Sequence, residues 1–219
     1  MSIRILLVDD HKMFREGLRA ILEHDGKMKV IGEASDGRQA VEMATGDSAP
    51  DVVIMDIGMP GLNGVDATRQ IVTKSPQIKV VALSAHTDRR FVAAMLEAGA
   101  SAYVLKEAAS DEIQRAVLAV HGGRKFLSPE IADSVIDGFV SGHSVASTKK
   151  NRPQLAARER EIVQLLAEGK TSKDIARLLT ISVKTVETHR RNIMGKLKMR
   201  SVAALTKFAI REGLTTTEE

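Results

Sequence analysis

The sequence predicts two domains of different fold class. The first is a parallel, doubly wound α/β sheet of five strands, and the second is a small all-α domain of four helices. Two observations lead to this division. Short apolar runs rich in Val and Ile alternate with amphipathic segments in the first half, whereas the last third has helical spacing and no strand signal. The length of 219 residues also suits two domains better than one.

The five expected strands are short apolar runs of the kind that are buried on both faces. They are Ile3–Val8, Met28–Ile31, Val52–Met55, Lys79–Leu83 and Ala102–Leu105. Segments with helical periodicity separate them, among them a stripe that ends at Gly99 and a helix expected at Ser110–His121. A regular alternation of strand and helix indicates βαβ crossovers and a parallel sheet covered on both sides.

The segment between the two domains differs from both in composition. We expect a linker at residues 124–153, with one helix at about 128–140 that has Pro129 at its first position. The stretch after that helix is small, polar and basic, which is typical of a flexible connection. The predicted division is therefore 1–123, 124–153 and 154–219.

The last third predicts four helices joined by short connections. Their expected ranges are about Ala157–Glu168, Ser172–Leu179, Val183–Leu197 and Ser201–Glu212. A short helix, a tight turn and a longer, more basic helix form the helix-turn-helix arrangement of DNA-binding domains. Gly169-Lys170-Thr171 looks like the end of a nucleotide-binding loop, but Gln164 replaces a required glycine and a helix precedes it, so we expect no nucleotide site.

The charge is distributed unevenly along the chain. Residues 1–148 hold 16 Lys/Arg and 20 Asp/Glu, a net charge of −4, whereas residues 149–219 hold 16 and 8, a net charge of +8. A basic module of this kind is suited to a polyanion. We therefore expect double-stranded DNA as a partner of the second domain.

Composition excludes several classes of protein. The chain has no cysteine, which excludes disulfides and thiolate metal sites and fits a reducing cytosol. No apolar run approaches the roughly 18 residues that span a bilayer, and the start of the chain lacks a signal-peptide pattern. We expect a cytoplasmic protein with no membrane partner.

Polar side chains follow four of the predicted strands. Asp9 and Asp10 follow the first strand, Asp56 the third, Ser84 the fourth and Lys106 the fifth. Each alone could be a turn or surface residue, but parallel strands bring their carboxyl ends to one edge, where ligands bind. Three neighbouring carboxylates need a cation, and all-oxygen ligands suit Mg²⁺. An aspartate in such a site can attack phosphorus, with Lys106 and the Ser84 hydroxyl contacting the phosphoryl oxygens.

The motifs LLVDDHK, VVIMDIGMPGLNG, VVALSAH and AYVLK resemble the receiver domain of two-component response regulators over residues 3–122. The resemblance implies a flavodoxin-like fold, Asp56 as phosphoacceptor and a sensor histidine kinase as phosphoryl donor. It also implies that Mg²⁺ is held by a set of oxygen ligands: Asp10, Asp56, the backbone carbonyl of Gly58 and, through water, Asp9. Ser84 and Lys106 would hold the phosphoryl group.

Two positions near this set leave alternatives open. Tyr103 matches the aromatic residue that acts with Ser84 as a switch in receivers, but a lone Tyr in a strand can also be a half-buried core residue. Glu107 follows Lys106 where many receivers have Pro, which leaves the conformation of that loop undetermined.

One face of the third helix of the second domain is polar. At 100° per residue, Lys184, Glu187, Thr188 and Arg191 lie together on one face. The opposite face is the expected buried stripe, formed by Val183, Val186, Ile193, Met194 and Leu197. A polar face can simply be solvated, but the short turn and the basic charge favour insertion into the DNA major groove. The candidates for phosphate contacts are Lys173, His189, Arg190, Lys196 and Lys198.

The segments ARERE and TSKDIARLLTISVKTVETHRRNIMGKL resemble the LuxR-type helix-turn-helix of NarL/FixJ regulators over residues 155–212. The resemblance places Lys184, Glu187, Thr188 and Arg191 where the family reads bases. It implies a homodimer, at least in the phosphorylated or DNA-bound form, with the last helix at the interface. Val202, Leu205 and Phe208 would serve equally well in an ordinary core. Ala156 stands where the family has a capping Thr.

Three hypotheses follow. The first is a transcription regulator that a phosphoryl group on Asp56 controls by acting on dimerisation and promoter binding. The second is a DNA-binding regulator with a receiver that is never phosphorylated. The third is a phosphohydrolase with an aspartyl-phosphate intermediate; it is disfavoured because Gly58 occupies the position of that enzyme class's general acid. We expect a regulator rather than an enzyme.

Overall fold

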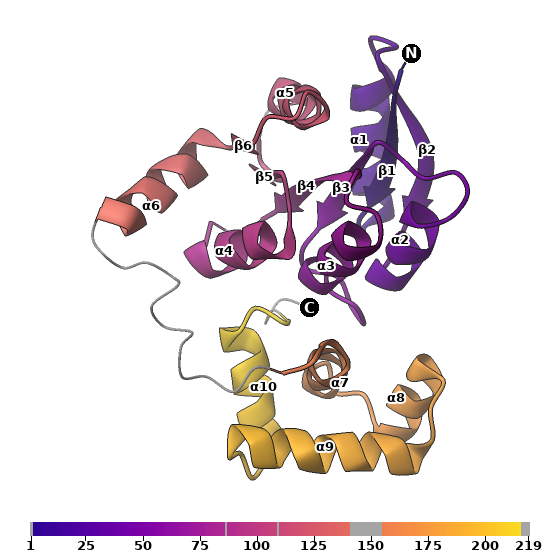
Figure 1. Cartoon of the computed structure of the whole chain (residues 1–219), viewed down its shortest axis with the longest axis vertical. Coiled ribbons are helices and arrows are strands. Elements are labelled where there is room, and N and C mark those ends of the chain that lie inside the picture. The colour runs from indigo at the N-terminus through magenta and orange to yellow at the C-terminus, as the bar shows by residue number, and fades with distance from the viewer. Residues whose placement is uncertain (1, 86, 109, 141–154, 216–219) are drawn as a thin grey trace. The chain divides into compact units, whose positions relative to one another are not determined.

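The computed structural model describes residues 2–85, 87–108, 110–140 and 155–215. The chain divides into two compact units, Met1–Val145 and Ala146–Glu219 (Figure 1). The first unit has a hydrophobic core on each side of a central sheet, and the second has a core of its own. No helix among the described residues is both long and apolar enough to cross a membrane.

The sheet of the first unit is entirely parallel, as the sequence predicts. Its strands follow the order β2-β1-β3-β4-β5-β6. Their bounds are β1 Ile3–Val8, β2 Met28–Ala34, β3 Val52–Asp56, β4 Lys79–Ser84, β5 Ala102–Leu105 and β6 Phe126–Leu127. The order 2-1-3-4-5 is that of flavodoxin-like folds, and it places the topological switch point, where the order of successive strands reverses, between β1 and β3.

The expected count of five strands was wrong by one. The sixth strand, β6, has two residues, which pair with Ala102 and Tyr103 of β5. A segment of two residues has no measurable alternation, so no sequence pattern identifies it. Its strand conformation depends on its pairing with β5.

Helices cover both faces of the sheet (Figure 1). One core contains side chains of α1 (Lys12–Glu23) and α5 (Ser110–His121). The other contains side chains of α2 (Gly37–Ala44), α3 (Gly64–Lys74) and α4 (Arg89–Ala98). Successive strand residues face opposite sides, so Ile5 and Leu7 belong to the first core and Leu6 and Val8 to the second. This two-sided burial explains the continuous apolar runs.

Local capping explains where several of these helices begin and end. The side chains of Asp36, Asn63 and Asp88 accept hydrogen bonds from the first free backbone N–H groups of α2, α3 and α4. Helix α4 ends at Gly99, whose φ of +107° is readily available to glycine alone. These caps fix where α2, α3 and α4 begin and where α4 ends.

The segment after α5 packs against the sheet. Ser128, fully buried, donates its backbone N–H to the Tyr103 carbonyl at 3.0 Å. Its hydroxyl accepts from the Leu105 N–H at 3.3 Å and donates to Glu112 of α5. Helix α6 (Pro129–Val140) follows and inserts Ile131 into the core beside α4. Residues 141–154 of the expected linker lie outside the described residues.

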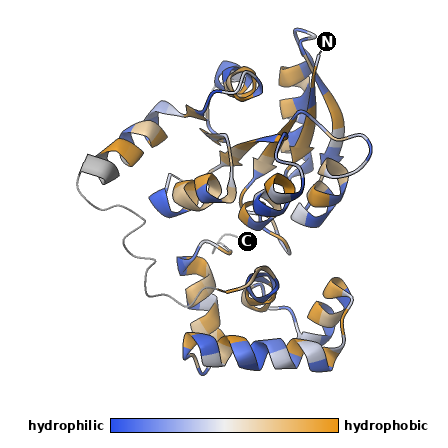
Figure 2. Ribbon diagram, viewed as in Figure 1, coloured by the Kyte–Doolittle hydropathy of each residue, from blue (hydrophilic) through white to orange (hydrophobic). Residues whose placement is uncertain are grey.

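The second unit contains the four helices that the sequence predicts. They are α7 Ala157–Ala167, α8 Ser172–Leu179, α9 Val183–Leu197 and α10 Val202–Arg211. Thr171, Ser182 and Ser201 cap the last three through their side-chain oxygens. Ala156 has no side-chain oxygen, but Glu159 accepts its backbone N–H at 2.7 Å. In Figure 2 the strands are largely hydrophobic, whereas α9 is largely hydrophilic.

Candidate functional site

The carboxyl ends of β1, β3 and β5 bring charged side chains together. Asp9 follows β1, Asp56 is the last residue of β3, and Lys106 follows β5. The Lys106 Nζ lies 2.7 Å from Asp9 Oδ2 and 3.0 Å from Asp56 Oδ2. Both carboxylates are buried, at 3% and 4% exposure. The three residues thus form a compact ion cluster although they are far apart in the sequence.

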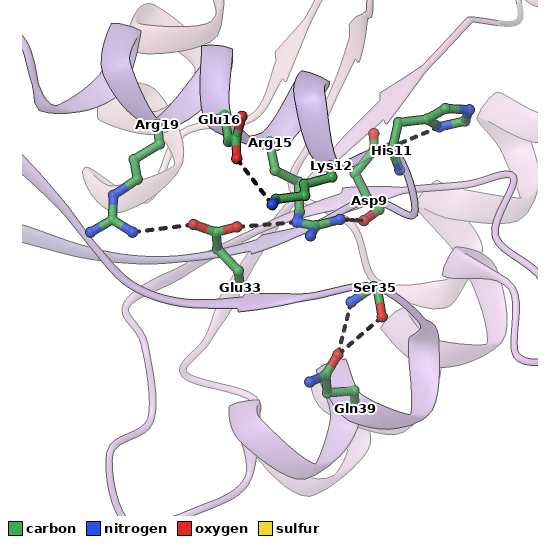
Figure 3. Close-up of polar contacts among 9 residues, drawn as sticks. All are labelled: Asp9, His11, Lys12, Arg15, Glu16, Arg19, Glu33, Ser35 and Gln39. Atoms are coloured by element: carbon green, nitrogen blue, oxygen red, sulfur yellow. Dashed lines mark hydrogen bonds and ion pairs between the residues drawn. The ribbon is translucent and has the colours of Figure 1, made fainter.

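The β1–α1 loop adds two more polar side chains. The side chain of Asp10 is 31% exposed, and the His11 Nδ1 lies 3.0 Å from Asp10 Oδ1 and 3.2 Å from Asp9 Oδ1. The His11 backbone N–H also donates to Asp9 Oδ1 at 2.8 Å (Figure 3). Among the described residues, Asp9, Asp10, His11 and Asp56 offer ligand atoms within 4.8 Å of one another. The sequence interpretation missed His11, although its position directly after Asp9-Asp10 was an available signal.

Burial controls the acidity of Asp56. Loss of hydration raises the pKa of its carboxyl group, and the nearby Asp9 raises it further. The Lys106 ammonium and the Gly58 N–H, 3.4 Å from Asp56 Oδ1, act in the opposite direction. Ionised Asp56 is therefore a carboxylate of raised basicity that depends on neighbouring positive charge.

Lys106 is held as a cation. Burial by itself would lower the pKa of its ammonium, but attraction to Asp56 and hydrogen bonding with Asp9 outweigh this and raise the pKa. The Nζ also lies 5.1 Å from the centre of the Phe14 ring, within range of a cation–π contact. The ammonium is thereby fixed between the two carboxylates.

The cluster has the chemistry of a hard-cation site. It contains three carboxylates, and Lys106 is paired with two of them. Oxygen donors from few protein groups, one of them partly exposed, match the preference of Mg²⁺ for carboxylates and water. The residues present thus fit such an ion.

Ser84 and Tyr103 lie at the ends of adjacent strands. Ser84 ends β4, is 1% exposed, and accepts the Lys106 backbone N–H at its carbonyl at 2.8 Å. The Tyr103 side chain is fully buried and hydrogen-bonded to that of Ser84, and burial raises the pKa of its phenol to about 12. Tyr103 is therefore a core residue with a direct connection to the strand end.

The polar face of α9 has the exposure that the periodicity predicts. Lys184, Glu187, Thr188 and Arg191 are all exposed, whereas Val186 and Ile193 are buried on the opposite side. The expectation that Val183 is buried was wrong: it is the first residue of α9 and is 42% exposed. The Ser172 hydroxyl of α8 donates to Glu187, and Thr188 donates its hydroxyl to the Lys184 carbonyl at 2.8 Å. Glu187 is thus oriented from the preceding helix.

The candidate phosphate-binding residues differ in their surroundings. Lys173 and Lys198 are exposed, and His189 and Arg190 are partly buried. The Lys196 Nζ lies 2.8 Å from Glu159 Oε2, and this contact lowers the pKa of Glu159. In this structure Lys196 therefore joins α9 to the start of α7.

Comparison with known proteins identifies both units. Residues 5–118 match the response regulator receiver domain, and residues 153–209 match the bacterial regulatory proteins of the luxR family. The response regulator UvrY of Escherichia coli K12 is 36% identical over 216 residues, which cover 99% of this chain and 97% of UvrY. The chain belongs to the NarL/FixJ family of two-component response regulators.

Other relatives of this response regulator agree. The transcriptional regulatory protein LiaR of Bacillus subtilis is 40% identical over 212 residues, covering 97% of this chain and 99% of LiaR. The crystal structure of the response regulator ChrA is 36% identical and covers 97% of this chain and 98% of its own, with a TM-score of 0.53. The members of the NarL/FixJ family are regulators of transcription rather than enzymes.

Proposed function

We propose that this response regulator accepts a phosphoryl group on Asp56 and thereby controls its binding to DNA. The observation that carries the proposal is the ion cluster of Asp9, Asp56 and Lys106 at the carboxyl edge of the sheet. Asp56 is the carboxylate at the centre of that edge, in the strand between β1 and β4. The phosphoryl donor is a phosphohistidine of a sensor kinase, the donor that receivers use.

The transfer itself is a displacement at phosphorus. An oxygen of ionised Asp56 attacks the phosphorus atom, and a P–O bond forms while the P–N bond to the kinase histidine breaks. The electron pair of that bond stays on the imidazole nitrogen, which takes up a proton from solvent. Lys106 offsets negative charge on the phosphoryl oxygens, and the Ser84 hydroxyl donates a hydrogen bond to one of them.

The proposed metal ligands are Asp10, Asp56 and the backbone carbonyl of Gly58, with Asp9 acting through water. The three carboxylates of the cluster support this assignment because their charge is only partly offset by Lys106. A bound Mg²⁺ supplies positive charge that stabilises the phosphoryl oxygens.

We propose that Ser84 and Tyr103 transmit the modification. The two side chains share a hydrogen bond, so a Ser84 hydroxyl that turns to the phosphoryl group leaves the Tyr103 hydroxyl without it. A buried hydroxyl without a partner is unfavourable, which favours rearrangement of the end of β4, helix α4 and β5. This change in the receiver promotes homodimerisation and promoter binding.

DNA binding is assigned to α9. Lys184, Glu187, Thr188 and Arg191 are the proposed base-reading residues in the major groove, and their common exposure supports this. The proposed phosphate contacts are Lys173, His189, Arg190, Lys196 and Lys198. Helix α10 is the proposed dimer contact on paired half-sites. Because the DNA is chromosomal, the proposal places the protein in the cytoplasm.

The phosphorylation site is tested by mass spectrometry of the intact chain. The wild type, incubated with a small acyl phosphate and Mg²⁺, is expected to gain one phosphoryl group. Asp56→Asn should gain none, whereas Asp133→Asn, which alters an exposed aspartate on α6, should react as the wild type does. Equal labelling of Asp56→Asn would show that another residue is the acceptor, and no labelling of the wild type would support the unphosphorylated-receiver hypothesis.

The DNA-reading assignment is tested by selecting binding sequences from a random pool with the phosphorylated chain. Arg191→Ala is expected to change the preferred sequence, because a bidentate arginine contact discriminates bases by about 1–3 kcal/mol. Lys29→Ala, an exposed charge change on β2, should keep the preference of the wild type. Identical preferences for all three proteins would remove Arg191 from the base-reading set.

A further inference from the structure

Arg15 connects helix α1 to the strand end that carries Asp9. Its Nη1 donates to the Asp9 backbone carbonyl at 2.6 Å, and its Nε donates to Glu33 Oε2 of β2 at 3.2 Å (Figure 3). The side chain of Arg15 is 13% exposed, so solvent competes little for these contacts. The guanidinium thus spans from the β1–α1 loop to β2.

Asp9 is restrained through both its backbone and its side chain. Its N–H donates to the Ala34 carbonyl of β2 at 3.2 Å, and its carbonyl accepts from Arg15. Its Oδ1 accepts from the His11 N–H, and its Oδ2 contacts Lys106. The Arg15 contact therefore fixes the peptide that joins Asp9 to Asp10, the two acidic residues of the loop.

Glu33 anchors Arg15 from a second direction. Its Oε1 accepts from the Arg19 Nη1 at 3.2 Å, and the Arg19 Nε lies 3.3 Å from Glu23 Oε2. Arg15 and Arg19 both lie on α1 and share Glu33, but Figure 3 shows that Arg15 is the one directed at Asp9. Charge-assisted contacts of this kind hold a guanidinium in a defined orientation.

We infer that Arg15 is a positioning residue for the cation-binding and phosphoryl-accepting site. It holds the Asp9 carbonyl, and through the Asp9–Asp10 peptide it fixes both carboxylates, without itself contacting the cation or Asp56. The inference rests on the proposed function, because it assigns Arg15 a role toward the metal ligands named there.

The loss of the Arg15 charge and the loss of its hydrogen bond to Asp9 should change the affinity for a divalent cation in opposite directions. Removal of a cation near three carboxylates strengthens divalent-cation binding by simple electrostatics. Loss of orientation weakens it, and loss of groups that orient metal ligands commonly costs about 10–100-fold in affinity. Arg19→Ala is the matched control. It removes a positive charge from the same helix and one of the two arginines that pair with Glu33, but it leaves the hydrogen bond from Arg15 to the Asp9 carbonyl in place.

The experiment measures free Mn²⁺ by electron paramagnetic resonance during titration of the full-length chain. Arg15→Ala is expected to weaken Mn²⁺ binding by about tenfold. Arg15→Lys, which keeps the charge but has one donor nitrogen in place of the two that Arg15 uses, should recover part of the loss. Arg19→Ala should bind Mn²⁺ as tightly as the wild type or slightly more tightly. Circular dichroism establishes that each variant is folded, and Arg15→Gln replaces Arg15→Ala if the latter is not.

Two results overturn the inference alone: Mn²⁺ affinity of the Arg15 variant equal to or above that of the wild type, or an equal loss in Arg19→Ala. A different result overturns the metal site itself. If the wild type does not bind Mn²⁺, or if Asp10→Asn and Asp56→Asn bind it as tightly as the wild type, the ligand assignment is wrong, and the role of Arg15 falls with it.

Discussion

At the scale of single residues, the burial of the Asp56 carboxylate has a cost in stability. Its carboxylate is buried, and its pKa is raised from 3.8 because burial penalises the ionised form. As pH rises, the unfolded chain loses this proton before the folded chain does. The folded state therefore binds more protons in that interval, and the free energy of unfolding falls as pH rises from about 3.8 through the raised pKa.

Asp56→Asn replaces the carboxyl group with an amide that does not ionise, so this fall in the free energy of unfolding disappears. In metal-free buffer the variant should therefore be more stable than the wild type at neutral pH. The expected gain is about 0.5–2 kcal/mol, the usual range for stabilising substitutions, and it should grow with pH across the interval and then level off. Lys106 keeps its contact with Asp9 at 2.7 Å in the variant. Urea unfolding at several pH values, followed by the fluorescence of Tyr103, the single tyrosine of a chain without tryptophan, reports on the receiver.

Asp133→Asn provides the comparison, since its side chain is exposed on α6 and its stability difference from the wild type should not vary with pH in this way. A gain for Asp56→Asn that is constant with pH, or a loss, would contradict the role assigned to burial. Added Mg²⁺ should stabilise the wild type more than Asp56→Asn, because a ligand that binds the folded state raises its stability.

The residues that stand at the strand ends could be predicted from the sequence. The contacts that a long side chain from a neighbouring helix makes with them could not. Asp9, Asp56 and Lys106 were identifiable because each ends a recognisable apolar run, and the parallel sheet brings those ends together. The contact between Arg15 and the Asp9 carbonyl depends on how α1 lies against β2, which no local pattern encodes. The sequence shows that a basic residue stands one turn into the helix that follows Asp9-Asp10, but not where its guanidinium points.

At the scale of elements, the start of α3 fixes the end of β3. A Cβ at Gly64, in the first turn of α3, would lie 1.9 Å from the Asp56 carbonyl oxygen and 2.9 Å from Ile57 Cα. Both neighbours are backbone atoms at the end of β3, next to the proposed phosphoacceptor side chain. The close approach of helix and strand is thus possible only without a side chain at Gly64.

Gly64→Ala should destabilise the receiver by about 3 kcal/mol, the upper end of typical overpacking, and impair phosphorylation by displacing Asp56. Gly17→Ala, in helix α1, is the matched control, because nothing lies within 4 Å of a Cβ there and Gly17 is exposed, so it should not destabilise the receiver. It should also be phosphorylated normally, since Gly17 is not among the proposed site residues. Urea unfolding and intact-mass labelling measure both effects, and equal behaviour of the two variants would contradict the packing argument.

The helix-turn-helix shows a second dependence between elements. Ser172 of α8 donates to Glu187, a proposed base-reading residue of α9. Ser172→Ala should release Glu187 and weaken the preference at the base it reads by about 0.5–1.5 kcal/mol, the net worth of one hydrogen bond. Thr206→Ala, which removes a hydroxyl on α10 that donates to Val202, should leave the preference unchanged. Binding to DNA variants with single base changes measures this, and an unchanged preference in Ser172→Ala would show that Glu187 needs no support from α8.

Long elements were predictable and short ones were not. The ranges of β1, α8 and α9 follow from periodicity together with capping residues such as Thr171 and Ser182. The two-residue strand β6 exists because Phe126 and Leu127 pair with β5, so it is a consequence of tertiary structure. The exposed polar side of α9 followed from helical geometry, whereas the Ser172–Glu187 contact depends on the angle between α8 and α9.

At the scale of the whole molecule, negative charge is concentrated in the receiver and positive charge in the helix-turn-helix unit. The residues of the receiver side, 1–148, carry a net charge of −4, and residues 149–219 carry +8. An acidic receiver with three clustered carboxylates has no attraction for the DNA backbone, whereas the basic unit does. The affinity of the full chain for DNA should therefore depend on local contacts of the second unit rather than on total charge.

The salt dependence of DNA binding distinguishes these two origins. For the phosphorylated chain, log K should fall linearly with log[salt], with a slope of about −0.9 per phosphate contact. Lys173→Ala should make the slope less steep by about 0.9 for each bound protomer and should weaken binding to all DNA sequences equally. Lys29→Ala, an exposed substitution on β2 with the same change in net charge, should leave the slope unchanged. Fluorescence anisotropy over a salt series measures all three proteins, and equal slopes for Lys173→Ala and Lys29→Ala would mean that Lys173 does not contact a phosphate.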